Sequence, residues 1–230
     1  MKKYAVIVAG GFGTRMGKSL PKQFMLLREK PLLYYTMNAF LEAFTDIRVI
    51  LVLPLDYMEM GREIIDAYFE KERFIVTAGG NTRFQSVQNG LVHAEEDSII
   101  FVHDGVRCLV TPDLIRRCHA MALKTGTAVP VVLSKDSIRL ITEEGNEALE
   151  RDKVVVVQTP QVFHGKILKA AYQIDYKDRF TDEASVVEAY GVKISLVEGE
   201  ETNIKITLPQ DLVIADYFLP HSSHSTHSST

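Results

Sequence analysis

The chain has 230 residues, of which 46% are hydrophobic and 24% are charged, and its formal net charge is −4. These values are typical of a soluble globular protein that can bury a sizeable core. The acidic balance argues against general nucleic-acid binding, which usually needs a basic surface, so an anionic ligand would have to be held by a local cluster of cations.

Cysteine usage and the N-terminus indicate the compartment. The two cysteines, Cys108 and Cys118, do not make a disulfide framework. No apolar run is long enough to cross a bilayer, and the first residues lead into a strand without a cleavage-site pattern. We therefore expect a cytoplasmic protein with neither a membrane nor a nucleic acid as a partner.

A continuous apolar run predicts a buried strand at residues 4–9. Beyond it, strands are predicted at 47–53, 74–77, 98–102 and 127–133, and helices at 31–43, at 56–70, from Asn81 or Thr82 onward, and at 111–124. This alternation is typical of an α/β fold with a doubly wound, mostly parallel sheet. Ligands of such sheets bind at the carboxyl ends of the strands, where loops 10–22, 79–86 and 103–107 carry glycines, cations and acids.

The pattern changes after residue 133. Two strand-like runs at 138–141 and 153–157 enclose a polar turn, which predicts a protruding β-arm at about 134–157. A plain surface hairpin is the alternative. Further on we expect helices at 164–176, 181–190 with a cap at Thr181, and 209–218, and short strands at 192–197 and 203–206. We expect one domain over residues 1–220 and a disordered tail at 221–230.

The first strand leads into a loop with four glycines between residues 10 and 17, followed by Lys22. Glycines let backbone N–H groups approach an anion closely. Arg15 could grip phosphate oxygens with its planar guanidinium, and Lys22 would act as a point charge. The loop therefore predicts a polyphosphate site.

Two common phosphate motifs fit this loop poorly. A dinucleotide fingerprint would need a third glycine where Met16 stands and an acid about 20 residues on. A P-loop would use Gly17-Lys18-Ser19, but its first glycine falls on Phe12, and Pro21 interrupts the helix that should follow.

A third pattern fits better. Ala9-Gly10-Gly11-x-Gly13-x-Arg15-Met16, followed by Pro21-Lys22-Gln23, is similar to the signature of sugar- and polyol-phosphate nucleotidyltransferases. Other segments resemble the 2-C-methyl-D-erythritol 4-phosphate cytidylyltransferase family, in that family's order and over nearly the whole chain: residues 79–87, 102–107, 158–161, 181–185, 197–199 and 203–207. The chain departs from the usual family loop, Val-His-Asp-Ala-Ala-Arg-Pro, by having Gly105, Val106 and Cys108.

The resemblance implies a Rossmann-like nucleotidyltransferase fold and a homodimer whose arms interlock. It implies that CTP and 2-C-methyl-D-erythritol 4-phosphate condense, with release of pyrophosphate, in the non-mevalonate isoprenoid precursor pathway. Mg²⁺ is the expected cofactor, since it favours oxygen ligands and keeps several waters.

The same resemblance implies roles for individual residues. Arg15, Lys22 and Lys205 would be catalytic. Nucleotide binding would fall to Ala9, Gly10, Gly11, Gly13, Gly80, Asn81 and Ser86. Substrate binding would fall to Asp104, Arg107 and Thr159, and to Ser137 and Arg151 reaching a neighbouring subunit's site from the arm. Asp104 would also help to hold the metal, or it could serve as a helix cap, whereas His103 is expected to be structural.

Three alternatives remain open at this stage. The acceptor could be ribitol 5-phosphate or another polyol phosphate. A P-loop kinase or NTPase would depend on Lys18 instead of Arg15 and Lys22. A nucleotide sensor without turnover would bind CTP and release no pyrophosphate, although the retained cations argue against it.

Overall fold

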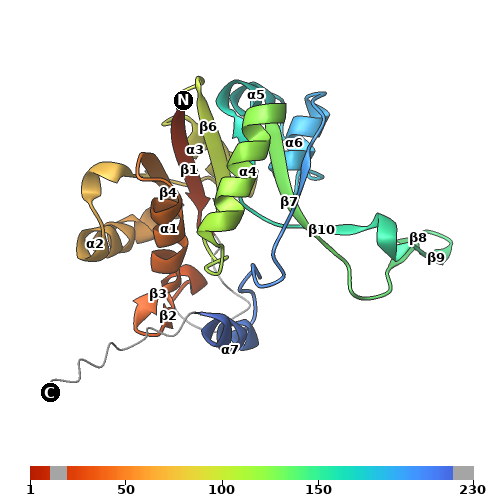
Figure 1. Cartoon of the computed structure of the whole chain (residues 1–230), viewed down its shortest axis with the longest axis horizontal. Coiled ribbons are helices and arrows are strands. Elements are labelled where there is room, and N and C mark those ends of the chain that lie inside the picture. The colour runs from red at the N-terminus through yellow and green to blue at the C-terminus, as the bar shows by residue number, and fades with distance from the viewer. Residues whose placement is uncertain (11–19, 220–230) are drawn as a thin grey trace, which may run out of the picture.

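The structure is a computed structural model that describes residues 1–10 and 20–219. Its centre is an eight-stranded sheet with the strand order β10-β7-β11-β6-β1-β4-β5, in which β12 pairs with β7 (Figure 1). The strands are β1 (Lys2–Val8), β4 (Ile47–Leu53), β5 (Phe74–Ala78), β6 (Ser98–Asp104), β7 (Thr127–Leu133), β10 (Val155–Val157), β11 (Gln161–His164) and β12 (Leu196–Glu198). β1 runs parallel to β4 and β6, and β4 runs parallel to β5, which confirms the mostly parallel sheet.

Helices cover both faces of this sheet. Along β1 the side chains alternate, so that Ile7 packs in one core cluster with Phe40, whereas Val6 packs in another with Val87. The helices are α1 (Leu32–Ala43), α2 (Met58–Tyr68), α3 (Arg83–Leu91), α4 (Pro112–Thr125), α5 (Gly165–Ala171), α6 (Glu183–Ala189) and α7 (Pro209–Phe218). The doubly wound architecture is therefore confirmed. Within the described ranges, none of these helices is long and apolar enough to span a membrane.

Short elements complete the fold. A small hairpin of β2 (Leu26–Leu27) and β3 (Lys30–Pro31) precedes α1. Single 3-10 turns occur at η2 (Lys22–Phe24), η3 (Leu55–Tyr57), η4 (Lys71–Arg73) and η5 (Arg151–Lys153). The predicted helix at 56–70 is therefore shorter, because its first turn is the 3-10 turn η3.

The second half of the chain departs from expectation in several places. The helix expected at 164–176 ends at Ala171 as α5, and the strand expected at 192–197 begins only at Leu196 as β12. Residues 161–164 form β11, which lies antiparallel between β6 and β7 and buries Val162 and Phe163 completely. The sequence did not indicate this strand, because four residues are too few to show a period. The strand expected at 203–206 is absent. Instead Ile206 N donates to Val106 O at 3.0 Å, and the only strand of the described segment 192–206 is β12.

An arm is present, but one of its two predicted strands is not part of it. Residues 155–157 of the predicted run 153–157 form β10, which pairs with β7 of the central sheet, and the hairpin of the arm closes within residues 139–148 instead. β8 (Arg139–Thr142) pairs antiparallel with β9 (Gly145–Ala148), and this hairpin projects away from the sheet (Figure 1). Every residue of both strands is exposed, including Ile141 at 79%. The hairpin therefore buries none of its strand residues against the rest of the described chain.

Side-chain caps fix where the site helices begin. Thr82 accepts a hydrogen bond from Gln85 N at 3.1 Å and caps α3, as one of the two expected residues. The cap of α6 is Asp182 and not Thr181, because Asp182 and Ser185 form a reciprocal capping box. This cap places Glu183 at the first position of α6, inside the protein.

The close packing of α3 on the sheet generates a prediction. A Cβ at Gly90 would lie 2.6 Å from Cγ1 of Val6 and 3.0 Å from Cγ2 of Val52, both fully buried. Overpacking costs about 1–3 kcal/mol, more than the gain of about 1 kcal/mol from replacing a helical glycine. We expect Gly90→Ala to lower the free energy of unfolding by about 1 kcal/mol in urea titrations.

Val6→Ala provides the control for this prediction, because it removes the methyl group that would lie closest to the added Cβ. In a Val6→Ala background the same glycine substitution should be neutral or stabilising, since neighbouring substitutions couple. An increase in stability on Gly90→Ala in the parent protein would contradict the packing argument.

Candidate active site

A cavity of about 300 Å³ lies at the carboxyl ends of β1, β5 and β6. We call it the glycine cavity. Its lining residues are Val8, Ala9, Gly10, Lys22, Gln23, Gly80, Asn81, Thr82, Arg83, Ser86, Asp104, Val106 and Lys205. The described part of the glycine-rich loop, the segment after β5 and the end of β6 therefore meet, as the fold argument predicted.

Backbone groups form one wall of the glycine cavity. Ser86 Oγ accepts from Gly80 N at 3.0 Å and donates to Thr82 O at 2.9 Å, which holds the turn against α3. A Cβ at Gly79 would lie only 2.8 Å from Ser86 Oγ, so this approach needs glycine. Opposite, the buried Gln23 donates to Ala9 O at 2.6 Å. These contacts give the cavity fixed backbone walls.

Asp104 ends β6 among cations. Its Oδ2 lies 2.9 Å from Lys205 Nζ and 3.8 Å from Arg107 Nε, and its Oδ1 lies 3.2 Å from Arg83 Nη2. Burial acts to raise the pKa of this carboxyl, but the charges of Arg83 and Lys205 outweigh burial and hold the pKa well below its usual value. Asp104 is therefore ionised at every working pH.

Lys22 enters the glycine cavity from the other side. It begins the 3-10 turn η2, and its Nζ donates to Thr207 O at 3.3 Å. That contact joins the segment after the glycine-rich loop to the segment 203–207. Two segments that the sequence singled out separately thus line the same cavity.

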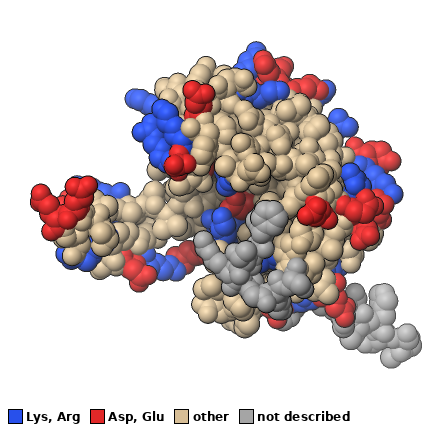
Figure 2. Space-filling view, turned by 180° about the vertical axis from the view of Figure 1, so that it is seen from behind, with Lys and Arg blue, Asp and Glu red and all other residues tan. Residues whose placement is uncertain are grey.

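A second cavity, of about 210 Å³, adjoins the first. We call it the threonine cavity. It is lined by Arg83, Asp104, Arg107, Val157, Gln158, Thr159, Gln161, Thr181, Asp182 and Lys205. Arg83, Asp104 and Lys205 line both cavities, so the two form one site with a charged seam between them. Figure 2 shows cationic and acidic side chains together in a hollow near the centre of one face.

A chain of hydrogen bonds supports the seam from below. Asp104 N donates to Thr159 Oγ1 at 3.1 Å, Thr159 Oγ1 lies 3.0 Å from His103 Nδ1, and His103 Nε2 lies 3.2 Å from Arg107 O. These contacts form a consistent chain if Thr159 donates to Nδ1 and Nε2 carries the proton. Burial lowers the pKa of His103 to about 3. His103 is therefore neutral at working pH, and its hydrogen bond to Arg107 O holds the loop that follows β6.

The segment 158–161 and Asn203 close the threonine cavity. Asn203 Nδ2 donates to Thr159 O at 2.8 Å, and Arg107 Nη1 donates to Asn203 O at 2.7 Å. Gln158 Nε2 donates to Glu200 O at 2.7 Å. The residues that precede β11 are thus tied to the segment 200–203, which also holds Arg107 beside the cavity.

The site brings together most of the predicted residues. Ala9, Gly10, Lys22, Gly80, Asn81, Ser86, Asp104, Arg107, Thr159 and Lys205 all line one or both cavities. Gly11, Gly13 and Arg15 lie outside the described residues. Ser137 and Arg151 line a separate hollow on the arm, which shares no lining residue with the site.

Sequence reasoning missed Arg83, which lines both cavities, and its buried partner Glu183. Each stood inside a segment already singled out, 79–87 or 181–185, yet neither was given a role. A lone arginine at a helix start carries no signal of its own. Their pairing, 100 positions apart in sequence, is visible only in three dimensions.

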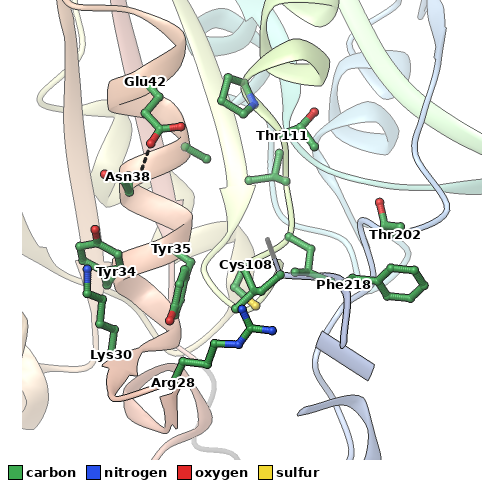
Figure 3. A pocket seen from close by; sticks show the side chains of 15 residues that line it. Arg28, Lys30, Tyr34, Tyr35, Asn38, Glu42, Cys108, Thr111, Thr202 and Phe218 are labelled. Atoms are coloured by element: carbon green, nitrogen blue, oxygen red, sulfur yellow. Dashed lines mark hydrogen bonds between the residues drawn. The ribbon is translucent and has the colours of Figure 1, made fainter. Parts of the chain in front are cut away.

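Another cavity, of about 600 Å³, lies between α1, the loop 108–112 and the end of α7 (Figure 3). Its two cations are engaged locally: Arg28 Nε lies 2.6 Å from Asp216 Oδ1, and Lys30 Nζ lies 3.9 Å from the centre of the Tyr34 ring. It shares no lining residue with the glycine or threonine cavity. The glycines and the charged seam thus single out the other two cavities as the candidate site.

The residues fit a metal ion only in part. Among the described residues there is no group of three or more His, Cys, Asp and Glu side chains that could hold a metal. Asp104 offers carboxylate oxygens, but Arg83 and Lys205 already surround it. The described residues therefore do not form a metal site by themselves, and Asp104 would supply one carboxylate to an ion such as Mg²⁺ whose other ligands came from a bound phosphate.

Comparison with known proteins gives a consistent result. A family model described as 2-C-methyl-D-erythritol 4-phosphate cytidylyltransferase matches residues 4–221. The protein of that name from Bacteroides thetaiotaomicron is 43% identical over 219 residues, covering 95% of this chain and 100% of that protein. The one from Clostridium botulinum is 38% identical over 222 residues, covering 94% and 98%.

Solved structures agree with these relatives. The 4-diphosphocytidyl-2C-methyl-D-erythritol synthase from Anaerococcus prevotii superposes with a TM-score of 0.80 at 26% identity, covering 94% of this chain and 97% of that chain. The 2-C-methyl-D-erythritol 4-phosphate cytidylyltransferase from Thermus thermophilus gives 0.73 at 31% identity, with coverages of 94% and 98%. The α/β nucleotidyltransferase fold is thus confirmed.

The buried neutral His103 generates a prediction about pH. The unfolded chain takes up a proton on His103 near pH 6.5, whereas the folded protein does so only near pH 3. The stability that this difference gives is complete above pH 6.5 and is lost as pH falls toward 3, at about 1.4 kcal/mol per pH unit.

We expect His103→Gln to flatten the dependence of the unfolding free energy on pH between 6.5 and 5, a window above most carboxylate pKa values. Urea titrations in the presence of a chelator would measure it. Burial also lowers the pKa of His119, which contributes equally in both proteins. The exposed His93→Gln is the control, and an unchanged slope in His103→Gln would contradict the assignment.

Proposed function

The chain belongs to the 2-C-methyl-D-erythritol 4-phosphate cytidylyltransferase family, and we propose that its two adjoining cavities bind CTP and the polyol phosphate side by side. It is a nucleotidyltransferase of the isoprenoid precursor pathway, which condenses CTP with 2-C-methyl-D-erythritol 4-phosphate and releases pyrophosphate. The relatives do not favour ribitol 5-phosphate as the acceptor.

The charged seam carries this proposal. The glycine cavity, with its backbone walls, takes the cytidine and the triphosphate, because glycines admit a flat base and expose N–H groups. The threonine cavity takes the polyol phosphate, with Arg107 at its rim and Asp104 facing the polyol hydroxyls. Lys205 and Arg83 line both cavities and therefore face both substrates.

The chemistry is a displacement at the α-phosphorus of CTP. A phosphate oxygen of the acceptor forms the new P–O bond, and the bond to the bridging oxygen of pyrophosphate breaks, which leaves the electron pair on pyrophosphate. The attacking oxygen is already an anion, so no general base is needed. The protein's task is to bring two anions together and to neutralise charge in an in-line transition state.

Cations of the site perform that task. Lys22 and Lys205 enter from two different segments and stabilise the charge on the α-phosphate and the leaving pyrophosphate. Arg15, from the undescribed part of the loop, is proposed to bind the triphosphate with them. Mg²⁺ would be held by the CTP phosphates and by Asp104, where it would further neutralise the phosphate oxygens.

The arm is proposed to act in a homodimer. Its strands are exposed, and Ser137 and Arg151 stand away from the site of their own chain. A second copy would cover the exposed strands and bring these two side chains to a neighbouring threonine cavity. We also propose a cytoplasmic location, which suits the two free, buried thiols.

Charge removal at the site tests the reaction. Lys22→Met and Lys205→Met should each lower kcat/KM by about 100-fold or more, because each removes a cation that faces developing charge. Pyrophosphate release from CTP and Mg²⁺ is the measurement, with methylerythritol phosphate and ribitol 5-phosphate as parallel acceptors. The exposed Lys166→Met on α5 is the matched control, and equal rates in all three variants would refute the assignment.

A mixing experiment tests the arm. Arg151→Ala and Lys205→Met should each be nearly inactive alone. Arg151→Ala lacks the cation that the arm supplies, and Lys205→Met lacks a cation of the cavities. After subunit exchange, a mixed dimer has one complete site, and about a quarter of the parental activity should return. If Arg151 acted within its own chain, mixing would restore nothing.

A further inference from the structure

Glu183 is a fully buried charged residue that the reaction as described does not use. Its exposed fraction is 0%, and it lines neither the glycine cavity nor the threonine cavity. Its Oε2 accepts from Arg83 Nη2 at 3.0 Å, and its Oε1 accepts from Arg83 Nη1 and, at 3.1 Å, from the Tyr172 hydroxyl. A buried charge is costly unless it is paired, so its partner is the place to look for a role.

That partner belongs to the charged seam. The guanidinium of Arg83 that Glu183 holds also reaches Asp104 Oδ1, from Nη2 at 3.2 Å and from Nε at 3.4 Å. Because two parallel hydrogen bonds fix the rotation of a planar guanidinium, Glu183 decides which edge of Arg83 faces Asp104.

The division of the Asp104 oxygens follows from this orientation. Arg83 takes Oδ1, which leaves Oδ2 for Lys205 Nζ at 2.9 Å. Without Glu183, Arg83 would have Asp104 as its one carboxylate partner. The Arg83 guanidinium could then rotate to bind both carboxylate oxygens of Asp104 and displace Lys205 from Oδ2.

The support behind Glu183 is rigid. Tyr172 is 2% exposed, and its ring stacks on that of Phe84 with 4.6 Å between the ring centres. Phe84 directly follows Arg83 on α3, and Glu183 begins α6. The first residues of α3 and α6 are thus packed against each other beneath the charged seam.

We propose that Glu183 is a positioning residue for cytidylyl transfer, which orients Arg83 and thereby keeps Asp104 and Lys205 aligned at the seam. The proposal rests on the proposed function of this same site. It gives Glu183 an effect on the chemical step, whereas a residue that only ties α3 to α6 would affect folding stability alone.

Glu183→Gln is the first test, because it keeps the size of the side chain and places an amide NH₂ group against Arg83. We expect kcat for pyrophosphate release to fall by about 10- to 100-fold, while KM for CTP and for the polyol phosphate each stay within about threefold. Glu188→Gln, an exposed change on the same helix, should keep the parental kcat and Tm.

A double-mutant cycle with Arg83→Met separates positioning from folding. If Glu183 acts through Arg83, Glu183→Gln should change kcat by less than about twofold once Arg83 is gone. An equal fall of kcat in both backgrounds would overturn the proposal, and so would a parental kcat in the single variant.

Glu183→Asp keeps the test available if Glu183→Gln does not fold. It retains the carboxylate but is shorter by one methylene, so that the carboxylate draws back from Arg83, and its folded form should show a reduced kcat. A parental kcat in folded Glu183→Asp would refute the positioning role. Absence of pyrophosphate release by the parent protein would instead refute the proposed function. The experiment therefore distinguishes a failure of the positioning role from a failure of the proposed function.

Discussion

The charge pairing around Asp104 is the interaction on which the rest of the site depends. A buried carboxylate is tolerated only when cations compensate it, and removing one partner of such a pair typically costs about 3–5 kcal/mol. Here Arg83 comes from the start of α3, Lys205 from the segment before α7, and Arg107 from the loop after β6. Pairing this one side chain therefore joins the start of α3 and the segment before α7 to the end of β6.

The same pairing explains how the protein can handle two polyanions although its net charge is −4. The cations are gathered locally, and Asp104 and Glu183 set their directions without cancelling them. His103 lies beneath them as a neutral hydrogen-bonding group, since burial lowers its pKa to about 3. An in-line transfer between anions needs fixed charges and no proton relay, and the site has this composition.

The sheet supplies the frame. The parallel strands β1, β4, β5 and β6 end at one edge, where the glycine cavity opens. The antiparallel β11 then enters beside β6, and the strand with the segment that leads into it places Gln158, Thr159 and Gln161 at the second cavity. Because β11 is inserted beside β6, the two cavities share a wall that includes Asp104.

Local patterns in the sequence predicted the four parallel strands and a helix cap at Asn81 or Thr82, because apolar runs and capping residues carry their signal within a few residues. The family resemblance supplied most of the cavity residues, including Lys205. Local patterns failed where the signal was too short or lay between distant residues. β11 has only four residues. Thr181 and Asp182 are both residue types that cap helices, and only the structure shows that Asp182 forms the capping box with Ser185. The pairing of Arg83 with Glu183, and the division of the Asp104 oxygens that it sets, were decided by the tertiary structure alone. A buried charge chooses its partner by proximity in the folded chain, and spacing along the sequence does not record that proximity.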